Sequence, residues 1–161
     1  MKKVIVLFLF MSTFSYAQYA IKGTMSPVEN SSWVLLYKIE GTKQIFVKNT
    51  QVRKEGKTGF FEFSLPTDAK VGSYRIKYSM KRDGFMDFLF NKENIAFEFN
   101  PKDLENTLVF QTSNENQLYN SFIKKTYTAQ YTLDSLQSEY FRNPSLEIKK
   151  AYAQSLEKVQ E

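Results

Sequence analysis

The spacing of apolar residues changes near residue 113, and this change sets what the chain can fold into. Before it, from residue 18, apolar and polar residues mostly alternate. After it, apolar residues recur at steps of three, four or seven. Alternation is typical of strands with one buried face, and the longer steps are typical of a helix with one apolar face. The pattern therefore predicts a β domain over 18–113 and a helical segment over 114–161.

Eight short strands are predicted in the first part. The clearest is 73–80, where every second residue is apolar: Tyr74, Ile76, Tyr78 and Met80. The candidates cover 19–25, 32–39, 44–52, 59–65, 73–80, 85–90, 94–99 and 107–112. Turn-forming residues separate them, and Asp83-Gly84 predicts a two-residue hairpin turn. Because no helix-length segment lies between the strands, we expect an antiparallel sandwich, or a barrel, of seven to eight strands.

The helical segment divides in two at Asn143-Pro144. Ser113 or Asn114 can cap the first helix, and Asn143 can cap the second, with Pro144 at its first position. Each helix carries an apolar stripe. The residues are Leu118, Phe122, Ala129, Leu133, Leu136 and Tyr140 in the first, and Ile148, Tyr152, Leu156 and Val159 in the second. We expect both to be amphipathic.

The first 17 residues have the features of a secretory signal peptide. Lys2 and Lys3 precede an apolar run over 4–11, and Ser15-Tyr16-Ala17 predicts cleavage after Ala17. A membrane-spanning helix needs about 20 apolar residues, so this run is too short for an anchor, and no later run is longer. We expect an exported protein, periplasmic or associated with the cell envelope, with no membrane span after cleavage.

The amino-acid composition excludes several kinds of active site. The chain has no cysteine and no histidine, which removes thiol redox chemistry, histidine bases and most zinc sites. Without Lys2 and Lys3, 20 Lys and Arg against 17 Asp and Glu leave a net charge of +3, and the bases are scattered. Nucleic-acid binding, which requires a basic patch, is not expected. Carboxylate or Ser/Lys chemistry stays open on composition.

Three groups of residues invite a functional interpretation, and each has a simpler one. Four tyrosines could form a ligand-stacking surface or simply belong to a packing face: Tyr119, Tyr127, Tyr131 and Tyr140. Asp83, Asp87 and Glu93 could bind a cation, but their spacing does not match a calcium loop. Glu62 and Glu98 could form a glycosidase pair, but each simply alternates with phenylalanines. We predict no catalytic residue, metal or cofactor.

Several segments, taken in order, resemble the N-terminal domain of Bacteroidetes-type exported thioredoxin-like proteins, the domain of unknown function 4369. They are "YAIKGTM", "WVLLYKI", "VRKEGKTGFFEFSLP", "GSYRIKY", "FLFNKENIAFEFN" and "VFQTSNENQLYNSFIKK". The resemblance covers about residues 18–125. It implies an accessory β-sandwich with a helical linker, often followed by a thioredoxin fold carrying Cys-x-x-Cys. This chain has no such motif, so no catalytic residue is carried over.

Three functions follow as hypotheses. The first is a noncatalytic accessory domain that acts with a thioredoxin-like domain, in cis or in trans. The second is a free-standing binding module for a glycan, peptide or envelope protein. The third is a hydrolase using carboxylates or Ser/Lys, but no residues have the spacing that such chemistry requires. If the chain is a fragment of a longer protein, residues 144–161 should be mobile and protease-sensitive in isolation.

Overall fold

A computed structural model describes residues 18–28 and 32–160. The predicted signal peptide, residues 1–17 with cleavage after Ala17, lies outside this range. The elements follow in the order β1 (Gln18–Met25), β2 (Trp33–Glu40), β3 (Lys43–Gln51), β4 (Arg53–Glu55), β5 (Thr58–Pro66), β6 (Gly72–Lys77), β7 (Phe85–Phe90), β8 (Ile95–Phe99), α1 (Leu104–Thr107), β9 (Val109–Phe110), α2 (Asn114–Arg142) and α3 (Leu146–Gln160).

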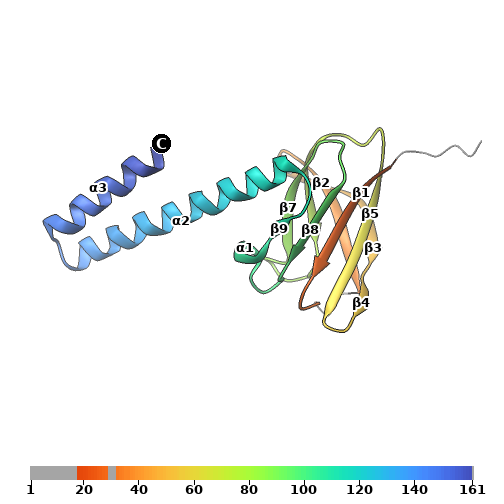
Figure 1. The fold of residues 1–161 in the computed structure, drawn as a ribbon, viewed down its shortest axis with the longest axis horizontal. Helices are drawn as coiled ribbons and strands as arrows, with labels where there is room; N and C mark the ends of the chain where they lie inside the picture. The colour runs from red at the N-terminus through yellow and green to blue at the C-terminus, as the bar shows by residue number, and fades with distance from the viewer. Residues whose placement is uncertain (1–17, 29–31, 161) are drawn as a thin grey trace, which may run out of the picture.

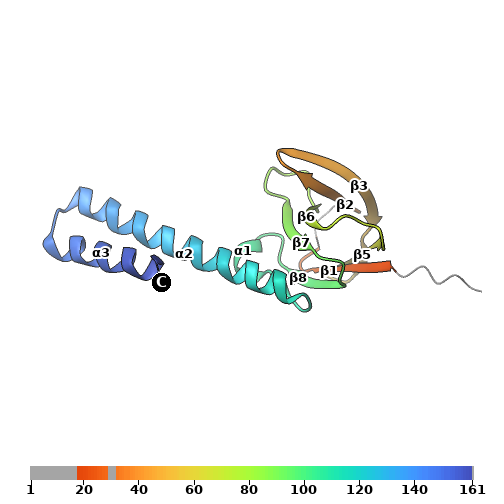
Figure 2. The same ribbon diagram turned by 90° about the horizontal axis from the view of Figure 1, so that it is seen from above.

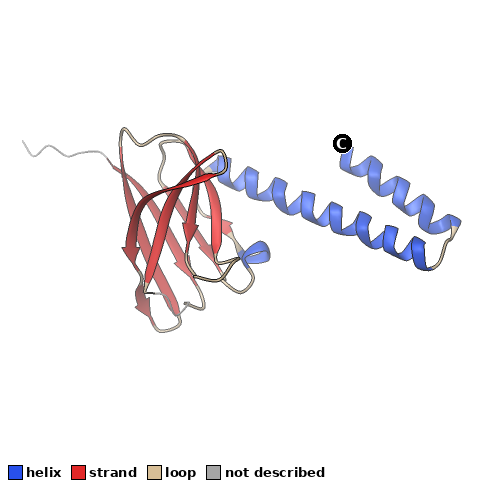
Figure 3. Ribbon diagram, turned by 180° about the vertical axis from the view of Figure 1, so that it is seen from behind, coloured by secondary structure: helices blue, strands red, loops and turns tan. Residues whose placement is uncertain are grey.

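The strands form two sheets packed face to face, as Figure 1 and Figure 3 show. One sheet has the order β4-β5-β1-β8-β9 and the other β3-β2-β6-β7. All pairings are antiparallel except β1 with β8, which is parallel. One of the places where the chain passes from one sheet to the other is Val52, between β3 and β4. The predicted mainly β sandwich followed by helices is therefore confirmed.

Alternate side chains of both sheets meet in an aromatic core. Phe63, Phe88, Phe90 and Phe97 are among its largest fully buried members. Since period-two alternation places one side of a strand in the interior, Tyr74, Ile76 and Tyr78 are buried as the pattern predicts. Met80 is the exception in 73–80: β6 ends at Lys77, and Met80 is 84% exposed in the following loop.

The two-residue turns lie at Gly41-Thr42 and Gly56-Lys57, joining β2 to β3 and β4 to β5. In each the first residue is a glycine with a left-handed φ, 59° and 60°, a conformation that glycine adopts at little cost. The predicted two-residue turn at Asp83-Gly84 is wrong. Residues 78–84 form a wider loop, because Tyr78 and Ser79 both donate their amides to the Gly84 carbonyl.

The predicted strand 107–112 is mostly wrong, because only Val109–Phe110 is extended. Thr107 belongs instead to α1, a single turn that follows Asn100-Pro101. The ladder ends after Phe110 because Gln111 and Thr112 both donate their amides to the Ala96 carbonyl, at 2.8 and 3.3 Å. The strand is therefore a short edge of its sheet.

Both helices form where the apolar spacing predicts them. Ser113 caps α2 as expected, its hydroxyl accepting from the Asn116 amide. The start of the second helix was predicted two residues too early. Ser145, not Asn143, accepts the amide of Ile148, and α3 begins at Leu146. Asn143 instead closes α2, since its amide donates to the Glu139 carbonyl at 2.8 Å.

The helices α2 and α3 form an antiparallel hairpin that projects away from the sandwich (Figure 1 and Figure 2). Leu133 and Leu136 of α2, and Ile148 and Tyr152 of α3, are half-buried between them. The predicted apolar stripe of α2 is thus covered over its second half only. The side chain of Val159 lies outside the described part of the structure.

Candidate interaction surfaces

The start of α2 is attached to the free edge of β7 by one side chain. Asn116 accepts from the backbone N–H of Leu89 at 2.8 Å and donates to the carbonyl of the same residue at 2.7 Å. Its amide thus satisfies an edge residue as a neighbouring strand would. Asn116 also donates to the Ser113 hydroxyl at 2.8 Å and is fully buried.

Two further amide side chains attach α2 to the other sheet. Gln117 donates to the Phe110 carbonyl and Asn120 to the Leu108 carbonyl, both at 2.9 Å. We call Asn116, Gln117 and Asn120 the amide clamp. Because β7 and β9 are edge strands of different sheets, the clamp holds the helix across the open side of the sandwich.

A cleft opens below α2, next to the clamp. Its volume is about 640 Å³. Its walls come from β7, α1, the segment Leu108–Phe110 and the underside of α2, including Phe85, Tyr119 and Tyr127. Asp83, Asp87 and Glu105 lie along it, with Lys124 on the helix side. We call it the β7 cleft. It combines apolar walls with a surplus of carboxylates.

The outer face of the four-stranded sheet is aromatic. Trp33, Tyr37 and Phe46 lie on β2 and β3, and Phe46 packs edge-on against Tyr37 at a centroid distance of 5.8 Å. Trp33 and Phe46 are among the exposed large apolar side chains. Next to them, Arg75 stacks over Phe85, 3.8 Å from its centroid, and makes two hydrogen bonds of 2.6 and 2.7 Å to Asp87.

Two side chains in the described part of the chain have shifted pKa values. The hydrogen bonds that Arg75 donates to the Asp87 carboxylate raise the pKa of Arg75 above its ordinary value. Burial raises the pKa of Tyr74, and the negative charge of Glu40 adds to the effect. Both groups keep their protons at neutral pH, so neither is prepared to act as a base. These shifts reflect packing and ion pairing in the sandwich.

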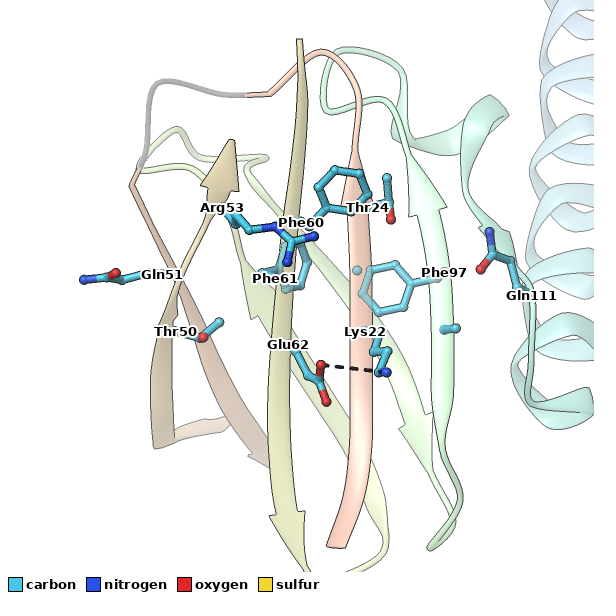
Figure 4. A pocket seen from close by; sticks show the side chains of 12 residues that line it. Lys22, Thr24, Thr50, Gln51, Arg53, Phe60, Phe61, Glu62, Phe97 and Gln111 are labelled. Carbon is cyan, nitrogen blue, oxygen red and sulfur yellow. Dashed lines mark ion pairs between the residues drawn. The ribbon is translucent and has the colours of Figure 1, made fainter. Parts of the chain in front are cut away.

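Figure 4 shows a shallow groove of about 530 Å³ on the outer face of the five-stranded sheet. Lys22 and Glu62 form an ion pair across it at 3.8 Å, and Arg53 lies over the ring of Phe60. Glu62 lies on β5 and Glu98 on β8, with β1 between them, so their strands are roughly 10 Å apart. Glu98 accepts instead from Gln111, at 3.3 Å. The structure does not bring the two carboxylates together.

The other predicted groups are dispersed as well. Asp87 pairs with Arg75, Glu93 accepts from the Ser113 hydroxyl at 2.6 Å, and Asp83 is exposed in its loop. Within the described residues, no three His, Cys, Asp or Glu side chains come close enough to hold a metal ion. The four tyrosines do not share a face. Tyr119 and Tyr127 line the β7 cleft, Tyr140 lies beside α3, and Tyr131 is 77% exposed.

The helical hairpin exposes apolar side chains on several sides. Leu118 and Phe122 continue the stripe that α3 covers farther along, and they are 72% and 63% exposed. Phe141 and Leu146 are exposed at the tip of the hairpin, where α2 passes into α3. Leu156 is 38% exposed on α3. Neighbouring exposed apolar side chains on a projecting element, such as Leu118 and Phe122, are typical of a protein–protein contact.

Sequence reasoning missed the amide clamp and the aromatic row around Arg75. The amide-rich stretch "NENQLYN" was a signal for the clamp, but its partners, Leu89, Phe110 and Leu108, lie earlier in the chain. The row follows from strand register, which brings Tyr37, Arg75 and Asp87 side by side. Alternation alone indicates which face each residue occupies, but not its neighbours.

Comparison with models of known protein families gives no match, and no curated protein is significantly similar to the chain in sequence. The resemblance to the domain of unknown function 4369 therefore stays a prediction. None of the helices that the structure describes is both long and apolar enough to cross a membrane.

Proposed function

We propose that this chain is a noncatalytic interaction domain of an exported thioredoxin-like thiol–disulfide oxidoreductase, acting on the redox domain in cis or in trans. The observation that carries the proposal is the projecting α2–α3 hairpin with its exposed apolar stripe. The stripe begins at Leu118 and Phe122 and passes under α3. A partner helix laid along these two residues would continue the packing that α3 makes with α2.

The sandwich acts as a rigid base for this arm. The amide clamp fixes the first turns of α2 to the edges of both sheets. The direction of the helix is thereby set relative to the core. The redox part of the proposal rests on the resemblance, which places a helical linker between the accessory sandwich and a thioredoxin fold.

A binding measurement tests the proposal. Residues 18–161 would be titrated with a purified exported thioredoxin-like domain encoded in the same genome. We expect saturable binding that weakens at least tenfold in the variant Leu118→Glu/Phe122→Glu, because a buried carboxylate opposes an apolar contact. Ser138→Glu, on the opposite side of α2, is the charge control and should bind like the wild type.

Equal binding by the Leu118/Phe122 variant and the wild type would exclude the stripe as the contact. For the cis form, the reading frame after the codon of Glu161 should continue into a thioredoxin fold with a Cys-x-x-Cys motif. A stop codon at that place would remove the cis form and leave the trans form to the binding test.

A second candidate is a binding module for a glycan, peptide or envelope protein. The aromatic outer face of the four-stranded sheet favours it, because Trp33, Tyr37 and Phe46 offer flat rings to a ligand. A glycan array and a pull-down from envelope extract would compare the wild type with Phe46→Ala. The candidate requires a ligand whose retention falls in the variant, and a blank result in both assays would remove it.

A further inference from the structure

The edge of β7 is only partly covered. β7 pairs with β6 on one side, and none of the strands that the structure describes pairs with it on the other. At Leu89 the backbone N–H and C=O point away from β6, because both bind the Asn116 side chain. In a strand, every second residue directs these groups to the same side. The backbone groups of Asp87 and Phe85 therefore also point away from β6.

These two residues lie where the β7 cleft begins. Outside the β6–β7 ladder, the hydrogen bonds of the described residues include none to the backbone of Phe85 or Asp87. Both residues line the cleft, together with Met86. The clamp thus covers the edge at Leu89 and leaves the next two edge positions open to the cleft.

The cleft has room and an apolar floor for a strand. Its volume is about 640 Å³. Met86, Leu108 and Phe110 are each buried to more than nine-tenths and face it from the sandwich side. An added strand would direct every second side chain toward this floor and the others toward solvent.

The charged side chains along the cleft favour a basic ligand. Asp83 and Glu105 are exposed at its rim, and no ion pair of the described residues involves either. Asp87 is paired with Arg75. Lys124, the one base lining the described cleft, directs its ammonium to the carbonyls of Asn106 and Leu108, at 3.4 and 3.3 Å. The rim is therefore acidic on a chain that is basic overall.

We propose that the β7 cleft binds an extended segment of a partner protein with alternating apolar and basic residues, added to the sheet as a strand beside β7. The apolar side chains occupy the floor, and the basic ones lie near Asp83 and Glu105. Main-chain pairing with Phe85 and Asp87 supplies the register. The site is separate from the Leu118/Phe122 stripe, so the proposal stands independently of the function proposed above.

The test uses the fluorescein-labelled peptide Lys-Val-Lys-Val-Lys and residues 18–161. Peptide residues that lie opposite Asp87 and Phe85 have side chains on the same outer face as these two residues. In this peptide they are the lysines, and their backbone N–H groups pair with β7. We expect methylation of the backbone nitrogens of the lysines to weaken binding at least tenfold. Methylation of the backbone nitrogens of the valines is the matched control, because their N–H groups point away from β7.

Two further measurements complete the test. In the complex, the amides of Phe85 and Asp87 should exchange more slowly, as read by NMR. The variant Asp83→Asn/Glu105→Gln should bind at least fivefold more weakly, while Asp134→Asn/Glu139→Gln, far along α2, should bind like the wild type.

Three results would overturn the proposal. They are equal binding of the two N-methylated peptides, equal binding of Glu-Val-Glu-Val-Glu, and no binding of the basic peptide at millimolar concentration. Loss of binding in both double variants would also count against it, because the effect would then come from net charge and not from this cleft.

Discussion

Gly23, in the middle of β1, has the ring of Phe61 lying against its backbone. A Cβ at this position would come within 2.1 Å of the Phe61 Cζ. The ring cannot easily move, because it packs edge-on against Phe63 and Phe97, at centroid distances of 6.0 and 5.9 Å. The missing side chain of Gly23 is therefore part of the core packing.

We expect Gly23→Ala to lower the free energy of unfolding by about 1–3 kcal/mol, the usual cost of an overpacked core. Urea denaturation measures the change. In the background Phe61→Leu, where the end of the ring is absent, the same substitution should cost less, and the double-mutant cycle gives the coupling. A cost independent of residue 61 would show that the contact is not its origin.

The other glycines show how local sequence can mislead. Asp83-Gly84 has the residues of a hairpin turn, yet Gly84 is needed for close approach: a Cβ there would lie 2.5 Å from the Cβ of Ser79. Gly41 and Gly56 instead supply the left-handed φ of the true two-residue turns. A glycine in a two-residue turn can be recognised from the sequence. A glycine needed for close approach, such as Gly84, cannot be recognised in this way, because its neighbour is known only from the structure.

At the scale of elements, α2 depends on Asn116. We expect Asn116→Ala to destabilise the protein by about 2–4 kcal/mol, because it leaves the N–H and C=O of Leu89 unpaired in a partly buried site. Asn116→Asp should not rescue it, since a carboxylate cannot donate to the Leu89 carbonyl. Asn114→Ala, at an exposed position, is the control. Thermal unfolding of the three variants measures the differences.

If Asn116→Asp were as stable as the wild type, the donated bond to Leu89 would contribute nothing. A loss in Asn114→Ala as large as that in Asn116→Ala would indicate a general effect on the helix start. The clamp explanation requires the loss at residue 116 alone.

The strands and helices could be predicted because burial of one face leaves a period in the sequence. The residues from Tyr74 to Lys77 on β6, and from Ile95 to Phe99 on β8, alternate between buried and more exposed as the sequence predicts. The role of Asn116 could not be predicted, because in a sequence an asparagine near the start of a helix has the features of a helix cap. Its partner lies 27 residues earlier, and only the packing of the helix across both sheet edges brings them together.

At the scale of the whole molecule, the sandwich and the hairpin differ in how they are stabilised. The sandwich has a continuous buried core. In α2 the buried residue is Asn116, and farther along the two helices only half-bury each other. The hairpin should therefore open locally without unfolding of the sandwich. For the same reason we expect residues 144–161 to be mobile and protease-sensitive in isolation if the chain is a fragment of a longer protein.

Deleting residues 129–161 tests it, because the deletion keeps the amide clamp and removes the helix pairing. We expect the melting temperature of the sandwich to change by less than about 4 °C, which corresponds to roughly 1 kcal/mol in a domain of this size. In the full chain, amides of 129–158 should exchange faster than those of β1, β6 and β8, and limited proteolysis should cut first within the hairpin.

Deletion from residue 114, which removes the clamp, is the contrasting variant and should lower the melting temperature by well over 4 °C. Exchange in the hairpin as slow as in β1, in a protein shown to be monomeric, would mean that the arm is held by more than the contacts described between α2 and α3.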